Sequence, residues 1–202
     1  MADRIESEFG WIVKGNDWSL PELQAIQAAG NQIRSYVDTL TNGRGQYWMG
    51  RYLAGATFRH GGLFGGGYSY VMGRTIHLTT NWVDEGSAHI AHELAHVWDN
   101  RSGLERHRPE AIWFGGGAAD IFQKTLGGGK VSGLRWMNGR NLKLPSDHQF
   151  PKEEYANHST ADYFADTFKY MLFYPEVLKK EVPGSADLIR QMQILIGIQA
   201  SR

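Results

Sequence analysis

The sequence predicts an α+β fold in which a small mixed sheet packs on a histidine-bearing helix, with further helices C-terminal to it. One observation is a short run, residues 74–80, that alternates apolar and polar side chains and is rich in β-branched residues, as strands are. The other is the recurrence of apolar residues at the spacing of one helix face. The segments with this spacing are 19–41, 87–103, 159–174 and 185–196.

The composition favours one folded domain. Of the 202 residues, 42% are hydrophobic, which is enough for a substantial core. We therefore expect a single domain over residues 1–202, with an N-terminal extension that includes a helix over residues 1–44.

Charge and cysteine content limit the classes of partner and site. Acidic and basic residues balance to a formal net charge of zero, which argues against nucleic acid or a membrane as the main partner. The chain has no Cys, so disulfides and thiolate metal sites are excluded. Residues 1–9 lack the apolar run of a signal peptide, and both a secreted and a cytoplasmic location stay open. The oligomeric state is not determined by the sequence.

Local signals define the elements in order. Residues 1–18 are expected to be irregular. Ser19 and Glu22 form a capping box at the start of helix 19–41. Residues 45–74 are rich in glycine and aromatic residues, and within them the run 61–67 is expected to be a loop or a hairpin tip. The strand at 74–80 is expected either at the sheet edge, where it could pair with an extended peptide, or in the interior.

The C-terminal half contains further helices. A short helix is expected over residues 118–126. Ser159 is a predicted N-cap for the next helix, which Pro175 ends. The last helix begins near Pro183.

The central feature of the chain is the sequence His92-Glu93-Leu94-Ala95-His96, an H-E-x-x-H motif. Residues four apart lie on one face of a helix, so the two imidazoles can bind one metal ion. Imidazole is a good zinc ligand, and catalytic zinc keeps three protein ligands and one open position. Glu93 can take a proton from a zinc-activated water. The motif predicts His92 and His96 as zinc ligands and Glu93 as a catalytic base.

The residues around the motif are consistent with a helix. Ser87 is an N-cap candidate, and Gly103 is a plausible stop. An apolar stripe at helical spacing consists of Ile90, Leu94, Val97 and Trp98. His89 lies three residues before His92 and could compete as a ligand. The residue after His89 is Ile90 and not a glutamate, so the pair His89 and His92 does not form an H-E motif. We therefore expect His89 to support a ligand or to lie at the surface.

A third ligand is expected from the helix 159–174. Asp162 and Asp166 are four residues apart on one face, where two carboxylates repel each other unless a cation compensates. The positive end of the helix dipole explains Asp162 alone, but Asp166 lies beyond the first turn. One Asp can bind the metal while the other holds a ligand histidine through its free N–H. The residues alone leave both assignments open.

The same helix carries a family resemblance. Tyr155, six further residues and then Asp162-Tyr163-Phe164-Ala165-Asp166-Thr167-Phe168 resemble the second motif of anthrax lethal factor-like zinc metallopeptidases. The resemblance implies a zincin-like fold with its catalytic core over residues 75–175. It also implies that Asp162 is the third zinc ligand, that Asp166 supports the site, and that Tyr155 stabilises the transition state or protonates the leaving group.

The chain departs from the family pattern at the two acidic positions. The family usually has Glu where Asp162 and Asp166 stand, and the spacing between its motifs is shorter. Because Asp is one methylene shorter than Glu, either the helix lies closer to the metal or Asp166 takes over as ligand.

The motifs together predict a zinc-dependent endopeptidase that acts on a protein or peptide substrate, as a toxin-like, effector or secreted enzyme. One alternative is a non-catalytic protein-binding module on the same scaffold, although such a module does not need Glu93. Another is a zinc hydrolase of a non-peptide bond.

Overall fold

The computed structural model describes residues 1–61, 69–79, 82, 85–104, 117–126, 146–148, 150 and 159–202. Within it the chain divides into two compact units, Met1–Trp98 and Asp99–Arg202. The single domain predicted over residues 1–202 stays a prediction. No helix in the described ranges is both long and apolar enough to cross a membrane.

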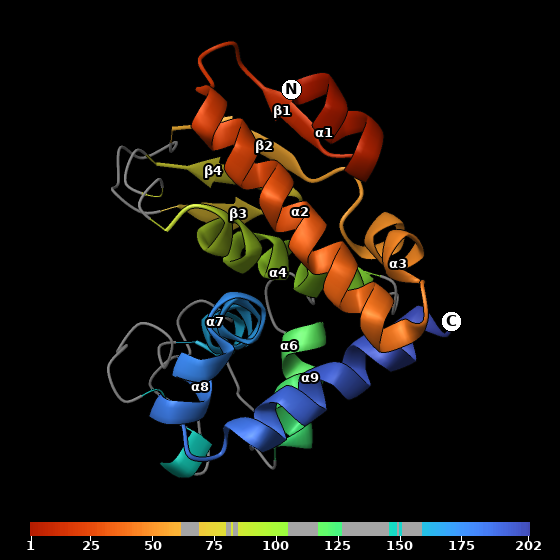
Figure 1. The fold of residues 1–202 in the computed structure, drawn as a ribbon, viewed down its shortest axis with the longest axis vertical. Coiled ribbons are helices and arrows are strands. Elements are labelled where there is room, and N and C mark those ends of the chain that lie inside the picture. The colour runs from red at the N-terminus through yellow and green to blue at the C-terminus, as the bar shows by residue number, and fades with distance from the viewer. Residues whose placement is uncertain are drawn as a thin grey trace. The chain divides into compact units, whose positions relative to one another are not determined.

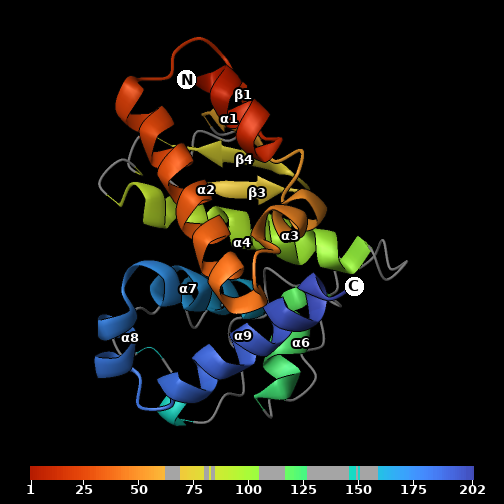
Figure 2. The same cartoon turned by 45° about the vertical axis from the view of Figure 1, so that its right-hand side comes forward.

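The first unit contains all the described strands, the long helix α2 and most of the long helix α4 (Figures 1 and 2). Its elements are α1 (Ala2–Phe9), β1 (Ile12–Lys14), α2 (Leu20–Thr41), α3 (Gly45–Tyr52), β2 (Thr57–His60), β3 (Tyr70–Met72), β4 (Thr75–Leu78) and the greater part of α4 (Ser87–Leu104). The described elements of the second unit are the end of α4, α6 (Ala118–Thr125), a 3-10 turn (Ser146–His148), α7 (Thr160–Phe173), α8 (Pro175–Glu181) and α9 (Ser185–Ala200).

The four strands form one mixed sheet in the order β1-β2-β4-β3. β1 pairs with β2 and β2 with β4 in parallel, whereas β3 pairs with β4 antiparallel. The predicted α+β class with a small mixed sheet is therefore confirmed. β4 corresponds to the predicted strand and has a partner on each side, so the alternative that placed it at the edge is wrong. The strand of the sheet that lies beside α4 in both views is β3 (Figures 1 and 2).

The prediction of an irregular N-terminus is wrong. Residues 1–18 contain α1, whose Ile5 and Phe9 are buried, and β1. β1 is only three residues long and acquires its hydrogen bonds from β2, far along the chain, so no local pattern indicates it. The segment 45–74 contains α3, β2 and β3, which no local signal in the sequence predicted. The loop or hairpin tip predicted at 61–67 lies outside the described residues except for Gly61.

Helix α2 begins with the predicted capping box between Ser19 and Glu22. Its central Gly30 lies against α1, because a Cβ at Gly30 would come within 2.7 Å of the Phe9 ring. The glycine lowers the helix propensity of α2, but it allows the buried Phe9 ring to pack on the helix backbone.

Gly30→Ala is expected to lower the free energy of unfolding by about 1–2 kcal/mol, because overpacking costs about 1–3 kcal/mol and the gain in helix propensity returns at most about 1. The matched control is Gly50→Ala in α3, where a Cβ meets nothing within 4 Å. We expect this control to gain about 0.5–1 kcal/mol. Urea unfolding measures both changes, and a stabilised Gly30→Ala protein would contradict the packing.

The apolar stripe of α4 is buried, as predicted. Ile90, Leu94, Val97 and Trp98 are fully buried, and the Trp98 ring packs edge-on against Trp48 with the ring centroids 5.0 Å apart. The predicted helix ends are displaced slightly: Ser87 is the first helical residue, and the helix continues one residue past Gly103. The core thus fixes the rotation of α4 and turns its histidines to the other side of the helix.

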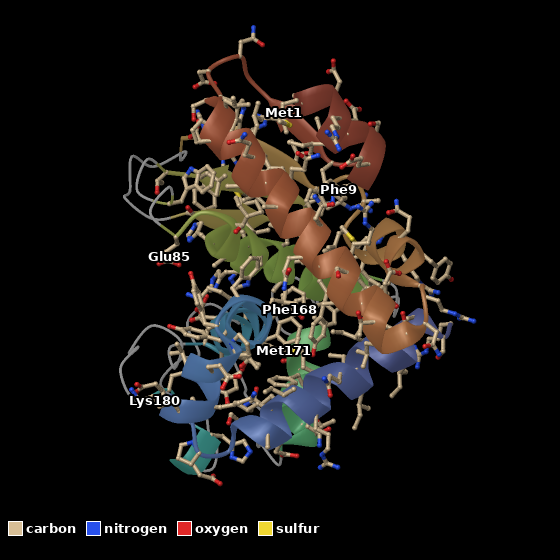
Figure 3. The ribbon with its side chains drawn as sticks, viewed as in Figure 1. Met1, Phe9, Glu85, Phe168, Met171 and Lys180 are labelled. Carbon is tan, nitrogen blue, oxygen red and sulfur yellow. The ribbon has the colours of Figure 1, made fainter. Side chains whose placement is uncertain are left out.

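In the second unit, the predicted helix 159–174 is α7. Ser159 caps it, and apolar residues at helical spacing along one face are buried; they are Phe164, Phe168, Met171 and Leu172. Phe168 and Met171 are labelled in Figure 3. Pro175 ends α7 as expected. It also begins α8, a helix that was not predicted. Proline has a helical φ and needs no N–H at the first helical position, so it suits both roles.

Candidate metal centre

Helix α4 brings four polar side chains onto one stripe. His89, His92, Glu93 and His96 stand at positions i, i+3, i+4 and i+7, which share a helix face. His92 and Glu93 are buried, with exposed fractions of 8% and 3%. Burial of polar groups such as these is costly unless they are hydrogen-bonded, paired with a charge or bound to a metal.

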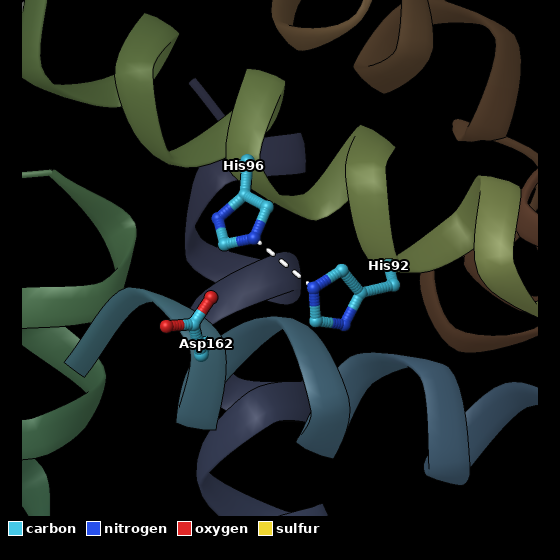
Figure 4. A group of neighbouring side chains, drawn as sticks. All are labelled: His92, His96 and Asp162. Carbon is cyan, nitrogen blue, oxygen red and sulfur yellow. Dashed lines mark hydrogen bonds between the residues drawn. The ribbon is translucent and has the colours of Figure 1, made fainter. Parts of the chain in front are cut away.

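The two motif histidines point their rings at a common place. The Nε2 atoms of His92 and His96 are 3.1 Å apart (Figure 4). Two ligand atoms on a tetrahedral zinc, each at about 2.0–2.1 Å, are about 3.3–3.4 Å apart. Two Nε2 lone pairs at this distance repel each other unless a proton or a cation lies between them. The rings are therefore close to the arrangement that a shared metal ion requires.

Asp162 completes the group. His92, His96 and Asp162 each offer one ligand atom, and these atoms all lie within 4.8 Å of one another. His92 and His96 come from α4 and Asp162 from the first turn of α7 (Figure 4). This group can hold a metal ion.

The donor set fits zinc. It consists of two imidazole nitrogens and one carboxylate oxygen, and a chain without cysteine has no thiolate to offer. Two histidines and one carboxylate are a known ligand set of catalytic zinc, because three protein ligands leave one position for water or substrate. A structural zinc site would instead fill all four positions with protein ligands.

Contacts within the second unit fix the position of the Asp162 carboxylate. The Ser159 hydroxyl donates to Asp162 Oδ2 at 2.5 Å and accepts the Asp162 N–H at 3.0 Å. The Thr160 hydroxyl donates to Gln123 Oε1 of α6 at 2.7 Å. The first turn of α7 is thus both capped and attached to its neighbour, so Asp162 needs little ordering to act as a ligand.

Tyr163 secures the same turn from another direction. Its hydroxyl donates to the His148 carbonyl at 2.6 Å, and its ring is buried. Burial raises the pKa of the Tyr163 hydroxyl well above its ordinary value, so it stays neutral and remains a donor at physiological pH.

Asp166 has a different environment from Asp162. It is 2% exposed, and its Oδ1 lies 3.1 Å from Nζ of Lys169, which is also buried. The Lys169 ammonium therefore compensates the charge of Asp166, the aspartate that the helix dipole does not explain. The metal-binding group contains Asp162 and not Asp166, and the supporting role predicted for Asp166 stays a prediction.

Glu93 is buried next to the two histidines. Its Oε2 makes no hydrogen bond to any described residue. An unsatisfied buried oxygen costs about 1–3 kcal/mol, and more when it is charged. Such a group persists in folded proteins where it has a catalytic or binding role. Tyr155, the other predicted catalytic residue, lies outside the described residues.

The structure adds one contact that sequence reasoning missed. His89 Nε2 lies 3.5 Å from Glu93 Oε1 and 2.9 Å from the Ser69 hydroxyl. The signal in the sequence was the four-residue spacing between His89 and Glu93, which places them on one face of the helix.

Comparisons of the chain with protein-family models, with curated proteins and with solved structures gave no match. The resemblance to the lethal factor-like metallopeptidases therefore stays a prediction that depends on the motifs of the chain.

Proposed function

We propose that the protein is a zinc-dependent endopeptidase with a zincin-like catalytic domain. One observation carries the proposal: His92, His96 and Asp162 form a group that can hold a metal ion, and a buried Glu93 lies beside it on the same helix. A structural metal site has no use for such a carboxylate, whereas hydrolysis needs a general base. Zinc is the metal that this donor set suits best.

A bound zinc ion would supply a Lewis acid that polarises the peptide carbonyl and acidifies the attacking water. His92, His96 and Asp162 would hold the ion, and Ser159 would keep the Asp162 carboxylate in place. Glu93 Oε2 would accept the proton of the attacking water and deliver it to the leaving amine. Because Glu93 is 3% exposed, bulk water would compete little for that proton.

Tyr155 has a place in this proposal by the family resemblance alone. It would donate a hydrogen bond to the developing oxyanion, which is the usual means of stabilising an acyl-transfer transition state. A protein or peptide substrate follows from the same resemblance.

The test of the proposal is cleavage by the wild-type protein with and without metal. We expect zinc-loaded protein to cleave casein or members of a peptide library. We also expect 1,10-phenanthroline to abolish this activity and added zinc to restore it, because the open coordination position is where the chemistry occurs. Mass spectrometry of the products identifies the cleaved bonds.

Small amide and ester substrates assayed in parallel separate the alternatives. Hydrolysis of these substrates without peptide cleavage would replace the peptidase by a hydrolase of a non-peptide bond. Zinc-loaded protein that hydrolyses nothing, yet binds a protein partner, would favour the binding module.

A further inference from the structure

His89 is the polar residue of the α4 stripe to which the proposed function gives no role. Its Nε2 lies 3.5 Å from Glu93 Oε1, one helical turn further along. The same nitrogen lies 2.9 Å from Oγ of Ser69, which precedes β3. The His89 side chain is 21% exposed and the Glu93 side chain 4%, so a partly exposed histidine lies against a buried carboxylate. All three residues belong to the first unit.

The Ser69 oxygen is placed to accept hydrogen bonds. The Thr79 N–H, at the end of β4, donates to it over a long 3.5 Å. A serine oxygen has two acceptor sites, so it can take a second hydrogen bond from the His89 ring. Ser69 and Glu93 Oε1 thus offer His89 Nε2 two acceptors from different elements of the same unit.

The protonation of Nε2 decides what this arrangement does. An Nε2–H can face the serine oxygen and the Glu93 carboxylate together, and both contacts are favourable. A bare Nε2 would accept from Ser69 but would present its lone pair to the carboxylate, which is repulsive. The Ser69 contact is compatible with either tautomer, whereas the Glu93 oxygen 3.5 Å away favours the tautomer with a hydrogen on Nε2.

We infer that His89 is a positioning residue for Glu93, and that its Nε2–H holds Oε1 so that Oε2 is the oxygen that transfers the proton. The role of Glu93 in this inference rests on the proposed function. The terminal torsion of a glutamate is broad and nearly two-fold, so without a partner on Oε1 the carboxylate can rotate and exchange its oxygens. His89 removes that freedom. Ser69 in turn fixes the orientation of the His89 ring.

The first test observes the hydrogen directly and needs no activity. A long-range proton–nitrogen correlation spectrum of the 15N-labelled full chain shows which ring nitrogens carry hydrogens, and the spectrum of His89→Gln assigns the His89 signals. We expect a protonated Nε2 on His89. A bare Nε2 with hydrogen only on Nδ1 would overturn the inference, because His89 would then accept from Ser69 and could not hold Glu93.

The second test compares two replacements of His89. His89→Leu removes the donor, and His89→Gln keeps an N–H donor at a similar reach. We expect His89→Leu to lower kcat by about 10- to 100-fold, as loss of a supporting residue typically does. KM and zinc content should stay unchanged, and His89→Gln should recover most of the rate. His77→Gln, on β4, is the matched control and should leave kcat unchanged.

Either a wild-type kcat in His89→Leu or a His89→Gln protein as slow as His89→Leu would overturn the inference, and circular dichroism verifies that the variants fold. If the wild-type protein cleaves no peptide, the proposed function fails. The spectrum of the His89 ring still decides whether Nε2 donates to Glu93, so the two failures are distinguishable.

Discussion

His96→Ala and Asp162→Asn are each expected to abolish stoichiometric zinc binding. Each removes one of the three ligand atoms that lie within 4.8 Å of one another. Loss of a residue that only supports a ligand lowers metal affinity by about 10- to 100-fold, so loss of a ligand should exceed about 100-fold. Metal analysis of purified protein and competition with a fluorescent zinc chelator measure the change. Wild-type protein should carry about one zinc ion per chain, as a three-ligand site implies.

The matched control for Asp162→Asn is Asp166→Asn, one turn further along α7. Asp166 lies 3.1 Å from Lys169 and is not one of the three candidate ligands. Asp166→Asn should therefore lower the free energy of unfolding and leave the zinc content near one ion per chain. Retention of zinc by Asp162→Asn together with its loss from Asp166→Asn would move the third ligand to Asp166. A wild-type protein that takes up no zinc, even when zinc is added, would remove the basis for the proposed enzyme.

Glu93→Gln is expected to lower kcat/KM by about 10²- to 10⁴-fold, the usual contribution of a general base. The amide keeps the shape of the side chain but cannot accept a proton from water. Because Glu93 is not a member of the metal-binding group, the variant should still bind zinc. Peptide cleavage and metal content are measured on the same preparation.

Glu85→Gln provides the control for this change, since Glu85 is exposed and precedes α4 outside the motif. It should retain wild-type activity and zinc. Cleavage by Glu93→Gln at the wild-type rate would show that another group takes the proton and would refute the assigned role of Glu93.

Helices with strong local signals were predictable from the sequence. The Ser19–Glu22 capping box, the stripe of α4 and the Ser159 cap of α7 each depend on residues within a few positions of one another. β4 was found for the same reason, since alternation is a local property. Whether that strand lay at the edge of the sheet was not predictable, because its neighbours β2 and β3 are defined by pairing and not by their own pattern.

The N-terminal elements show the limit of local reasoning most clearly. α1 has only eight residues, and its two buried side chains, Ile5 and Phe9, are too few to establish a periodicity. Phe9 packs where Gly30 leaves the backbone of α2 open, a contact between residues far apart in the chain. Tertiary packing of this kind stabilises a helix that is too short to be stable in isolation.

The pair of candidate metal ligands on α4, His92 and His96, was predictable from the sequence alone. The spacing of His92 and His96 is fixed by the helical repeat, and the apolar stripe fixes which way the helix turns. The residues alone left Asp162 and Asp166 both possible as the third ligand, and the structure includes Asp162 in the group of three ligand atoms while Asp166 lies 3.1 Å from Lys169. Likewise only the tertiary structure placed Ser69 against His89 beside Glu93. Helical periodicity relates residues within a turn or two, whereas His89 and Ser69 are 20 positions apart and meet through a contact that no local pattern encodes.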